Sequence, residues 1–316
     1  MRPARRQPYL AERDRRVDQA PAPGPESAPG RVPAVDARTF LGIEPTDDPL
    51  LWRLAVTPAV STPGRFLYGG CGLAAGIVAL EAVTGRPTVW ASAQYLSHAP
   101  TGTVVDWEVV PAAVGHNTTQ ARAVGRVDGV EVLTVNAALG VQNLVHEGVW
   151  VHPPEVPPPA ACEKRDMPDF FADTVMARVD QRLARGRSFD QLDGTPGDPR
   201  SAFWARVPGH LEPSAATLAV IGDWVSGGAS QPLGRPTMGR SLDNTIRVVR
   251  LVPTEWILCD IHMHAVVHGF GHGLAHLWAE DGTLLATASQ SISVRLWNDE
   301  LLGARRPTGA HAQPQG

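Results

Sequence analysis

The fold is decided by residues 241–295, which read SLDNTIRVVRLVPTEWILCDIHMHAVVHGFGHGLAHLWAEDGTLLATASQSISVR. β-Branched and polar residues alternate in this stretch, and short turn signals divide it into four runs, residues 241–250, 256–267, 273–278 and 283–294. Alternation with a period of two is typical of β-strands. The dipeptide Asp281-Gly282 stands between apolar pairs and is a strong hairpin signal. The stretch therefore predicts an antiparallel meander.

The same meander carries side chains that could activate water. Asp243 lies in the first run, His264 in the second and Gln290 in the last. An acid, a hydrogen-bonding side chain and an amide on neighbouring strands could polarise a water molecule between them. This arrangement suggests a hydrolase.

Length and composition limit the classes of protein. The chain has 316 residues and a net charge of −4 at pH 7. This length predicts one large or two ordinary domains, and the weakly acidic balance gives no support to nucleic-acid binding. The three cysteines, Cys71, Cys162 and Cys259, lie far apart, which favours free thiols in a reducing compartment.

Targeting signals are weak. No apolar run approaches the roughly 18 residues that a membrane helix needs. Arg5-Arg6 is followed by the charged residues 11–16, where a signal peptide would have an apolar core. We therefore expect a cytoplasmic protein with no membrane contact.

Composition also divides the chain into segments. Residues 1–35 and 299–316 hold few large apolar residues and are predicted to be disordered tails. Residues 151–168 contain two runs of proline and are predicted to form a stiff linker. Two folded units remain, residues 36–150 and 169–298.

The two units repeat one order of elements. The first is predicted to contain a short helix and a strand (36–40 and 52–56), a buried helix (69–83) that ends at Gly85, and strands over 88–96, 103–111, 118–127 and 130–139. The second is predicted to contain strands over 174–183 and 202–207, a helix over 213–225 with Ser214 as a possible cap, a loop over 227–240, and the meander. Asp128-Gly129 and Asp281-Gly282 take corresponding places. The order of elements indicates a duplicated α+β architecture.

Four segments carry a resemblance to a known family. They are Tyr68-Gly69-Gly70, GHNTTQAR (115–122), Ser241-Leu242-Asp243 and DGTLLATASQ (281–290). Together they resemble the acyl-CoA thioesterase II family over about residues 50–297. The resemblance implies a double hotdog, in which two antiparallel sheets each wrap a long central helix and join into one sheet. It implies hydrolysis of acyl-CoA to a free acid and coenzyme A, without a metal or redox cofactor.

The resemblance also implies site residues. The water-activating aspartate of the family falls on Asp243 and its glutamine on Gln290. The third member, usually threonine or serine, falls by spacing on His264, which departs from the family pattern. Histidine can still bond a water molecule or act as a base.

Further site residues follow from the first unit. The family's Gly-Gly-Gln at the helix start is Gly69-Gly70-Cys71 here, and the amides of Gly70, Cys71 and Gly72 are expected to polarise the thioester carbonyl. Asn117 and Thr118 are expected to line the opposite side of the acyl site, although alternating polarity along a strand explains them equally well.

Each candidate has a structural alternative. Asp243 could be a turn residue, and Gln290 could pair with backbone on an edge strand. The even-numbered histidines would share one face of a continuous strand, and they are residues 262, 264, 268, 272 and 276. Glycines interrupt that strand, as a bulge would, and no carboxylate or thiolate completes a ligand set, so no metal site is predicted. The glycines of residues 69–76 resemble a dinucleotide loop, but the next strand does not end in the acidic residue that such a site needs.

Two functions remain open. The first is an acyl-CoA thioesterase. The second is a non-catalytic protein that binds acyl-CoA or an acyl carrier, which the substitution at His264 and the altered Gly-Gly-Cys sequence motivate. A hotdog hydratase is disfavoured because the sequence lacks the Asp and His segment that this chemistry needs. Exposed sheet edges in this fold commonly pair, so a homodimer or tetramer is expected.

Overall fold

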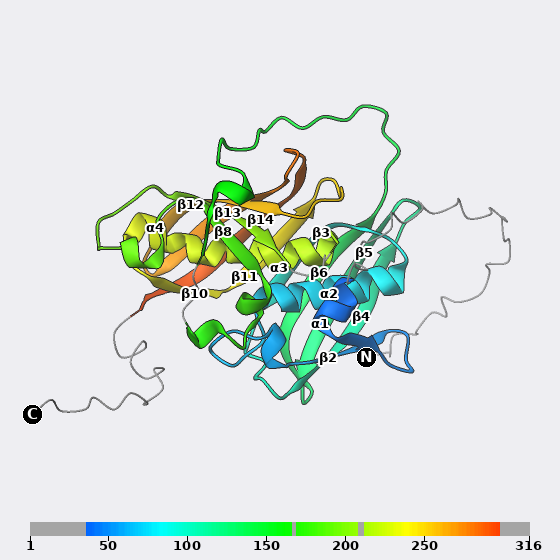
Figure 1. The fold of residues 1–316 in the computed structure, drawn as a ribbon. Coiled ribbons are helices and arrows are strands. Elements are labelled where there is room, and N and C mark those ends of the chain that lie inside the picture. The colour runs from blue at the N-terminus through cyan, green and yellow to red at the C-terminus, as the bar shows by residue number, and fades with distance from the viewer. Residues whose placement is uncertain (1–35, 166–168, 208–211, 298–316) are drawn as a thin grey trace, which may run out of the picture. The chain divides into compact units, whose positions relative to one another are not determined.

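The computed structural model describes residues 36–165, 169–207 and 212–297 (Figure 1). The predicted tails, residues 1–35 and 299–316, lie outside the described residues, as does the end of the predicted linker at 166–168.

The described residues form one antiparallel sheet of 14 strands. Its order is β1-β2-β4-β5-β6-β3-β11-β14-β13-β12-β9-β8-β7, and β10 pairs with the end of β14. The strands are β1 (Ile43–Pro45), β2 (Leu51–Ala55), β3 (Thr88–Tyr95), β4 (Val104–Val114), β5 (Thr118–Val127), β6 (Val130–Gly140), β7 (Glu163–Lys164), β8 (Asp180–Arg185), β9 (Arg200–Arg206), β10 (Thr237–Ser241), β11 (Asp243–Val248), β12 (Ile257–Val267), β13 (Phe270–Ala279) and β14 (Leu284–Leu296).

The sheet joins two halves of the chain. Strands β1 to β6 form the N-terminal half, and β7 to β14 form the C-terminal half. The seam between them is the antiparallel pair β3 and β11, whose register runs from Asp243 opposite Gln94 to Arg247 opposite Trp90. Because this pairing is continuous, side chains from both halves meet beneath the same strands.

Helices pack on the inner face of the sheet (Figure 1). In the N-terminal half, α1 (Ala37–Leu41) precedes α2 (Gly69–Thr84), which contacts β3, β4, β5 and β6. The residues of α2 are mostly small or apolar and ten of them are buried, and Gly85 ends it with a φ of 63°, as predicted. Within the described residues, no helix combines the length and apolar character that crossing a membrane requires.

The helical segment of the C-terminal half changes type along its length. Ser214 caps α3 (Ala215–Gly222) by accepting from the Thr217 amide at 3.1 Å. The 3₁₀ helix η6 (Asp223–Ala229) and the short α4 (Ser230–Leu233) follow without a break. The predicted helix over 213–225 was therefore too short, because the helical segment continues into the predicted loop. The remaining 3₁₀ turns are η1 (Pro58–Val60), η2 (Pro159–Ala161), η3 (Asp169–Phe171), η4 (Val175–Arg178) and η5 (Phe189–Gln191).

Two further predictions about the C-terminal half were wrong. The strand predicted over 174–183 begins at Asp180, because Thr174 caps the 3₁₀ turn η4 by accepting from the Met176 amide at 3.3 Å. Strand β10 lies in the predicted loop over 227–240, where glycines and prolines concealed its pairing with β14.

The histidine-rich hairpin also differs from its prediction. His268 and Gly269 have φ values of 53° and 77° and form a tight turn, so β12 and β13 are separate strands. The register shift in this hairpin occurs between Met263 and Ala265, not among the glycines. Gly271 and Gly273 lie inside β13, where a Cβ atom would come within 2.9 Å of Ile292 and 2.7 Å of Met263.

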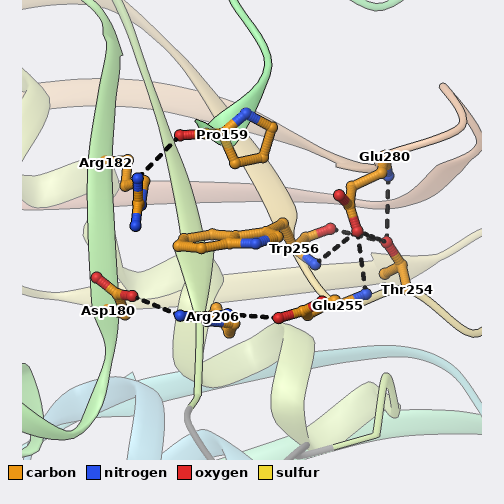
Figure 2. A network of polar contacts seen from close by, with 8 residues as sticks. All are labelled: Pro159, Asp180, Arg182, Arg206, Thr254, Glu255, Trp256 and Glu280. Atoms are coloured by element: carbon orange, nitrogen blue, oxygen red, sulfur yellow. Dashed lines mark hydrogen bonds and ion pairs between the residues drawn. The ribbon is translucent and has the colours of Figure 1, made fainter. Parts of the chain in front are cut away.

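An apolar cluster covers the outer face of the C-terminal half. Its members are Cys162, Ala202, Trp204, Trp256, Leu258, Trp278 and Leu284. Figure 2 shows Trp256 with Arg182 and Arg206, whose guanidinium carbons lie 5.2 Å and 4.3 Å from the ring centroid. Arg206 also pairs with Asp180 at 2.9 Å and with Glu255.

The same network attaches the proline-rich segment to the sheet. Arg182 donates to the Pro159 carbonyl at 3.3 Å (Figure 2), and the Trp204 indole donates to the Pro157 carbonyl at 2.9 Å. Glu280 accepts from the Trp256 amide at 3.1 Å. The segment that connects the halves is thus held on the outer face, away from the inner-face helices.

Candidate active site

The inner face of the C-terminal half contains a buried carboxylate, Asp223, which is 2% exposed. It lies where α3 gives way to η6, next to the start of α2. Its Oδ2 accepts from the Gly70 amide at 2.6 Å. Its Oδ1 accepts from Ser241 Oγ at 3.3 Å, from Asn244 Nδ2 at 3.1 Å and from Gln290 Nε2. The site therefore takes its residues from α2 in one half and from η6, β10, β11 and β14 in the other.

Glycine at the start of α2 makes this approach possible. A Cβ atom on Gly70 would lie 2.8 Å from the Asp223 Cβ and 2.9 Å from the Val220 carbonyl oxygen. The second of these atoms is backbone and cannot move aside. Tyr95 fixes the same helix start, because its hydroxyl donates to the Gly69 carbonyl at 2.7 Å.

Burial controls the ionisation of this cluster. Loss of solvent raises the pKa of Asp223 to about 7, while hydrogen bonds from Gly70, Gln290 and Ser241 act in the opposite direction. Burial and the Asp223 charge also hold the pKa of Tyr68 and Tyr95 well above its ordinary value. A carboxylate with a pKa near neutrality is suited to accept a proton from water.

Gln290, like Gly70, is a predicted site residue that contacts this carboxylate. It is 3% exposed, and its Nε2 also lies 3.3 Å from Ser241 Oγ. Its Oε1 is buried and has no partner among the described residues. Because a buried acceptor without a donor is costly, this oxygen is a natural acceptor for a bound water molecule.

Asp243 does not join Gln290 on the inner face. It precedes the inward-facing Asn244 on β11, so its side chain points away from the inner face. Its Oδ1 accepts from the Ser291 amide at 2.6 Å, at the irregularity between β10 and β11. The prediction that Asp243 and Gln290 share one face is therefore wrong, because Asp243 is adjacent to the inward-facing Asn244, and neighbouring residues of a strand point to opposite faces of the sheet.

His264 also lies elsewhere. It is exposed on β12 at the register shift, and its ring stands 5.3 Å from that of His262. Strand β13 separates β12 from β14. The structure therefore does not bring His264 to Gln290. Among the described residues, no three His, Cys, Asp or Glu side chains form a group that could hold a metal ion.

The predicted residues of the first unit fall in two places. The amides of Gly70 and Gly72 already have acceptors, Asp223 Oδ2 and the Tyr68 carbonyl. The Cys71 side chain is fully buried, which raises the pKa of its thiol. Thr118 begins β5 and pairs with Gly140, and Asn117, the residue before the strand, donates from Nδ2 to Gln142 Oε1 at 3.1 Å, so neither residue contacts this site.

Sequence reasoning missed Asp223, Ser241 and Asn244. A signal for Asp223 was present, since the helix predicted over 213–225 is apolar except for a charged residue near its end. An acid within a helix that is otherwise buried needs partners in the core. Alternation along β11 would have placed Asn244 beside the buried Ile246.

Comparisons with known structures define the fold. A hot dog fold protein of unknown function from Alicyclobacillus acidocaldarius is 20% identical, with 83% of this chain and 98% of that chain covered and a TM-score of 0.73. A candidate thioesterase from Novosphingobium aromaticivorans is 29% identical, with coverage of 78% and 96% and a TM-score of 0.70. An acyl-CoA thioesterase II, TesB2, from Mycobacterium marinum is 17% identical, with coverage of 83% and 99% and a TM-score of 0.63. The chain has a hotdog fold.

A protein-family model matches the C-terminal part of the chain. The acyl-CoA thioesterase C-terminal domain family matches residues 153–294. This match confirms the resemblance to acyl-CoA thioesterase II for the C-terminal part of the chain. The matched region contains Asp223, Ser241, Asn244 and Gln290 but not the start of α2. No curated protein sequence matches the chain.

Proposed function

We propose that this protein hydrolyses acyl-CoA thioesters and that Asp223 is its water-activating base. The observation that carries the proposal is the Asp223 carboxylate, which Gln290 and Ser241 contact directly beside the N-terminus of α2. The raised pKa of Asp223, about 7, supports this role. The family of residues 153–294 supports the reaction class.

The reaction needs no covalent enzyme intermediate. Asp223 accepts a proton from a water molecule that also donates to Gln290 Oε1, and the water oxygen attacks the thioester carbonyl carbon. The negative charge that develops on the carbonyl oxygen is stabilised by the first-turn amides and the positive end of the dipole of α2. The carbon–sulfur bond then breaks, coenzyme A leaves as a thiolate, and the free acid remains.

We further propose that each half is one hotdog unit, over residues 36–150 and 169–298, so that the chain is a double hotdog. The pairing of β3 with β11 supports this arrangement, since it makes the two halves neighbours across a single seam. The site would then require both units, one for the carboxylate and one for the helix N-terminus. Edge pairing into a dimer or tetramer stays a prediction.

A comparison of two carboxylates tests the mechanism. The purified protein would be assayed with acyl-CoA esters of increasing chain length by release of free thiol. Asp223→Asn should lower kcat by about 10³-fold, because an amide cannot accept the proton. Asp243→Asn should keep kcat within about threefold, since an amide oxygen can still accept from the Ser291 amide. The reverse pattern would restore Asp243 as the base and overturn this assignment.

A non-catalytic acyl-CoA binder is the second candidate. One observation favours it, namely that all four donors around Asp223 are satisfied within the protein, as in a structural contact between helices. This function predicts that a non-hydrolysable acyl-CoA analogue binds while no acyl-CoA ester is turned over. Turnover that depends on Asp223 would exclude it.

A further inference from the structure

Asn244 is a buried polar residue of the site that the proposed reaction does not use directly. It is 1% exposed and lies on the inner face of β11. Its Nδ2 donates to Asp223 Oδ1 at 3.1 Å. Its backbone lies inside the sheet, because Asn244 pairs with Ala93 of β3 and the following residues of β11 pair with β14.

We propose that Asn244 is a positioning residue, which fixes the orientation of the Asp223 carboxylate and favours its ionised form. A donor aimed at a buried carboxylate oxygen stabilises the anion and not the acid. If Oδ1 were protonated, one of its three donors, Ser241, Asn244 or Gln290, would have to turn away or exchange its role. The inference rests on the proposed function only for its effect on rate.

The two oxygens of Asp223 are held from different halves of the protein. Oδ2 is bound by the Gly70 amide of α2, whose start is anchored by the bond from Tyr95 to Gly69. Oδ1 is bound by Asn244 and its neighbours in the C-terminal half. The Asn244 amide also acts on Tyr95, where it lowers a phenol pKa that burial and the Asp223 charge raise. Asn244 therefore lies where the carboxylate, the seam and the helix start meet.

No other ionisation in this cluster obscures that of Asp223. The titratable groups that face it are Tyr68 and Cys71 from the start of α2 and Tyr95 from β3. Burial raises the pKa of each of them, so all three stay neutral between pH 5 and about 9. Within this cluster, Asp223 is therefore the group that titrates between these limits.

The test compares Asn244→Leu with a matched control. Leucine keeps the approximate volume and removes the donor. We expect kcat at pH 7 to fall about tenfold, KM to stay within about twofold, and the acidic limb of the pH profile to move up by about one pH unit, so that activity partly recovers at pH 9. The control is Thr245→Val, which removes the 2.7 Å bond to Ser92 from the adjacent residue on the outer face. It should leave the profile unchanged.

Two outcomes would overturn the proposal. One is an equal loss of kcat at every pH, which a purely structural role predicts, and the other is a control that shifts the limb equally. If Asn244→Leu does not fold, Asn244→Ser provides a smaller side chain with a donor, and it should shift the limb less than half as far. A full shift in Asn244→Ser would also contradict the role of the donor.

A second readout does not depend on activity. If the protein hydrolyses no thioester, the proposed function fails, but Asn244 can still be tested through the unfolding free energy. Stability declines as pH rises through the folded-state pKa of Asp223. In Asn244→Leu, this decline should extend about one pH unit higher than in the wild type, and an unchanged curve would contradict the inference.

Discussion

The two halves of the sheet share one plan but bury different side chains beneath their helices. In the N-terminal half, β3 and β6 turn mainly small or apolar residues inward, Ala91, Ala93, Val135 and Ala137, and the polar exception is Tyr95, whose hydroxyl donates to the Gly69 carbonyl. In the C-terminal half, the corresponding seam strands β11 and β14 turn inward a mixed set, Asn244, Ile246, Ala288 and Gln290. The helices differ in the same way, since α2 continues for 16 residues while the C-terminal segment changes from α to 3₁₀ at Asp223.

Under the proposed function, this difference explains how two halves with a similar order of strands can form a single site. One half places an acid and its donors in the core, and the other half supplies the helix start that approaches them. Gly70 is the point of contact, because its amide reaches Asp223 across the boundary. Apolar packing stabilises the N-terminal half, whereas the C-terminal half has polar side chains in its core that form the hydrogen-bonded cluster around Asp223. Four substitutions test this contrast.

The largest effect on stability is expected on the outer face of the C-terminal half. Trp256→Ala should lower the unfolding free energy by about 3–5 kcal/mol, because it removes a buried ring held between two guanidinium groups. The free energy would be measured by urea denaturation. The control is Trp150→Ala, whose side chain is 88% exposed and which should change stability by no more than about 0.5 kcal/mol. Equal effects would show that the outer-face cluster does not stabilise this half.

The buried acid should make the protein less stable at high pH. Because burial raises the pKa of Asp223 from 3.8 to about 7, its contribution is fully present below pH 3.8 and is lost as pH rises through 7. The pKa difference corresponds to a loss on the order of 4 kcal/mol. Asp223→Asn should flatten the dependence of unfolding free energy on pH across this window. A mutant curve parallel to that of the wild type would show that Asp223 is not the group responsible.

Sequence alone located the elements with strong local signals. The meander was predicted well because alternation defines β12, β13 and β14, and the Asp281-Gly282 turn fixes where β14 starts. The helix starting at Gly69 was predicted to within one residue at its end, where Gly85 stops it. Strand β10 was missed because its residues pair with residues of β14 that are 51 to 59 positions away, from Ser241 with Ile292 to Thr237 with Leu296, and because its own residues resemble a loop.

The site was harder to predict, because its contacts are distant in sequence. Gly70 and Asp223 are separated by 153 positions, and no local pattern links them. Gln290 was identified from the family motif, and the structure places it in the cluster. Asp243 was chosen from the same motif, but a motif does not state which face a side chain takes, and the inward positions here are Ser241 and Asn244. Which residues of a strand face inward depends on the strands that it pairs with, and a single sequence does not show those partners.

Adding one methyl group at Gly70 should break the contact between the start of α2 and Asp223. Gly70→Ala should reduce kcat/KM by about 100-fold, because a methyl group 2.9 Å from the Val220 carbonyl oxygen would displace α2 from Asp223. The acyl-CoA assay measures this effect. Gly227→Ala is the control, since a Cβ there has no atom within 4 Å. A Gly70→Ala protein with normal activity would show that the close approach of α2 is unnecessary.

A buried hydroxyl group should destabilise the core of the N-terminal half, although the core of the C-terminal half contains several buried polar groups. Val135→Thr keeps the shape of a fully buried side chain facing α2 but adds a hydroxyl, and it should cost about 1–2 kcal/mol of unfolding free energy without lowering kcat. Val130→Thr on the same strand is the control, because Val130 is 64% exposed and should tolerate the change. If Val135→Thr instead lowered kcat as strongly as a change at Asp223, the N-terminal half would contribute more than a helix start to the site, and the asymmetry between the halves would be smaller than their buried residues indicate.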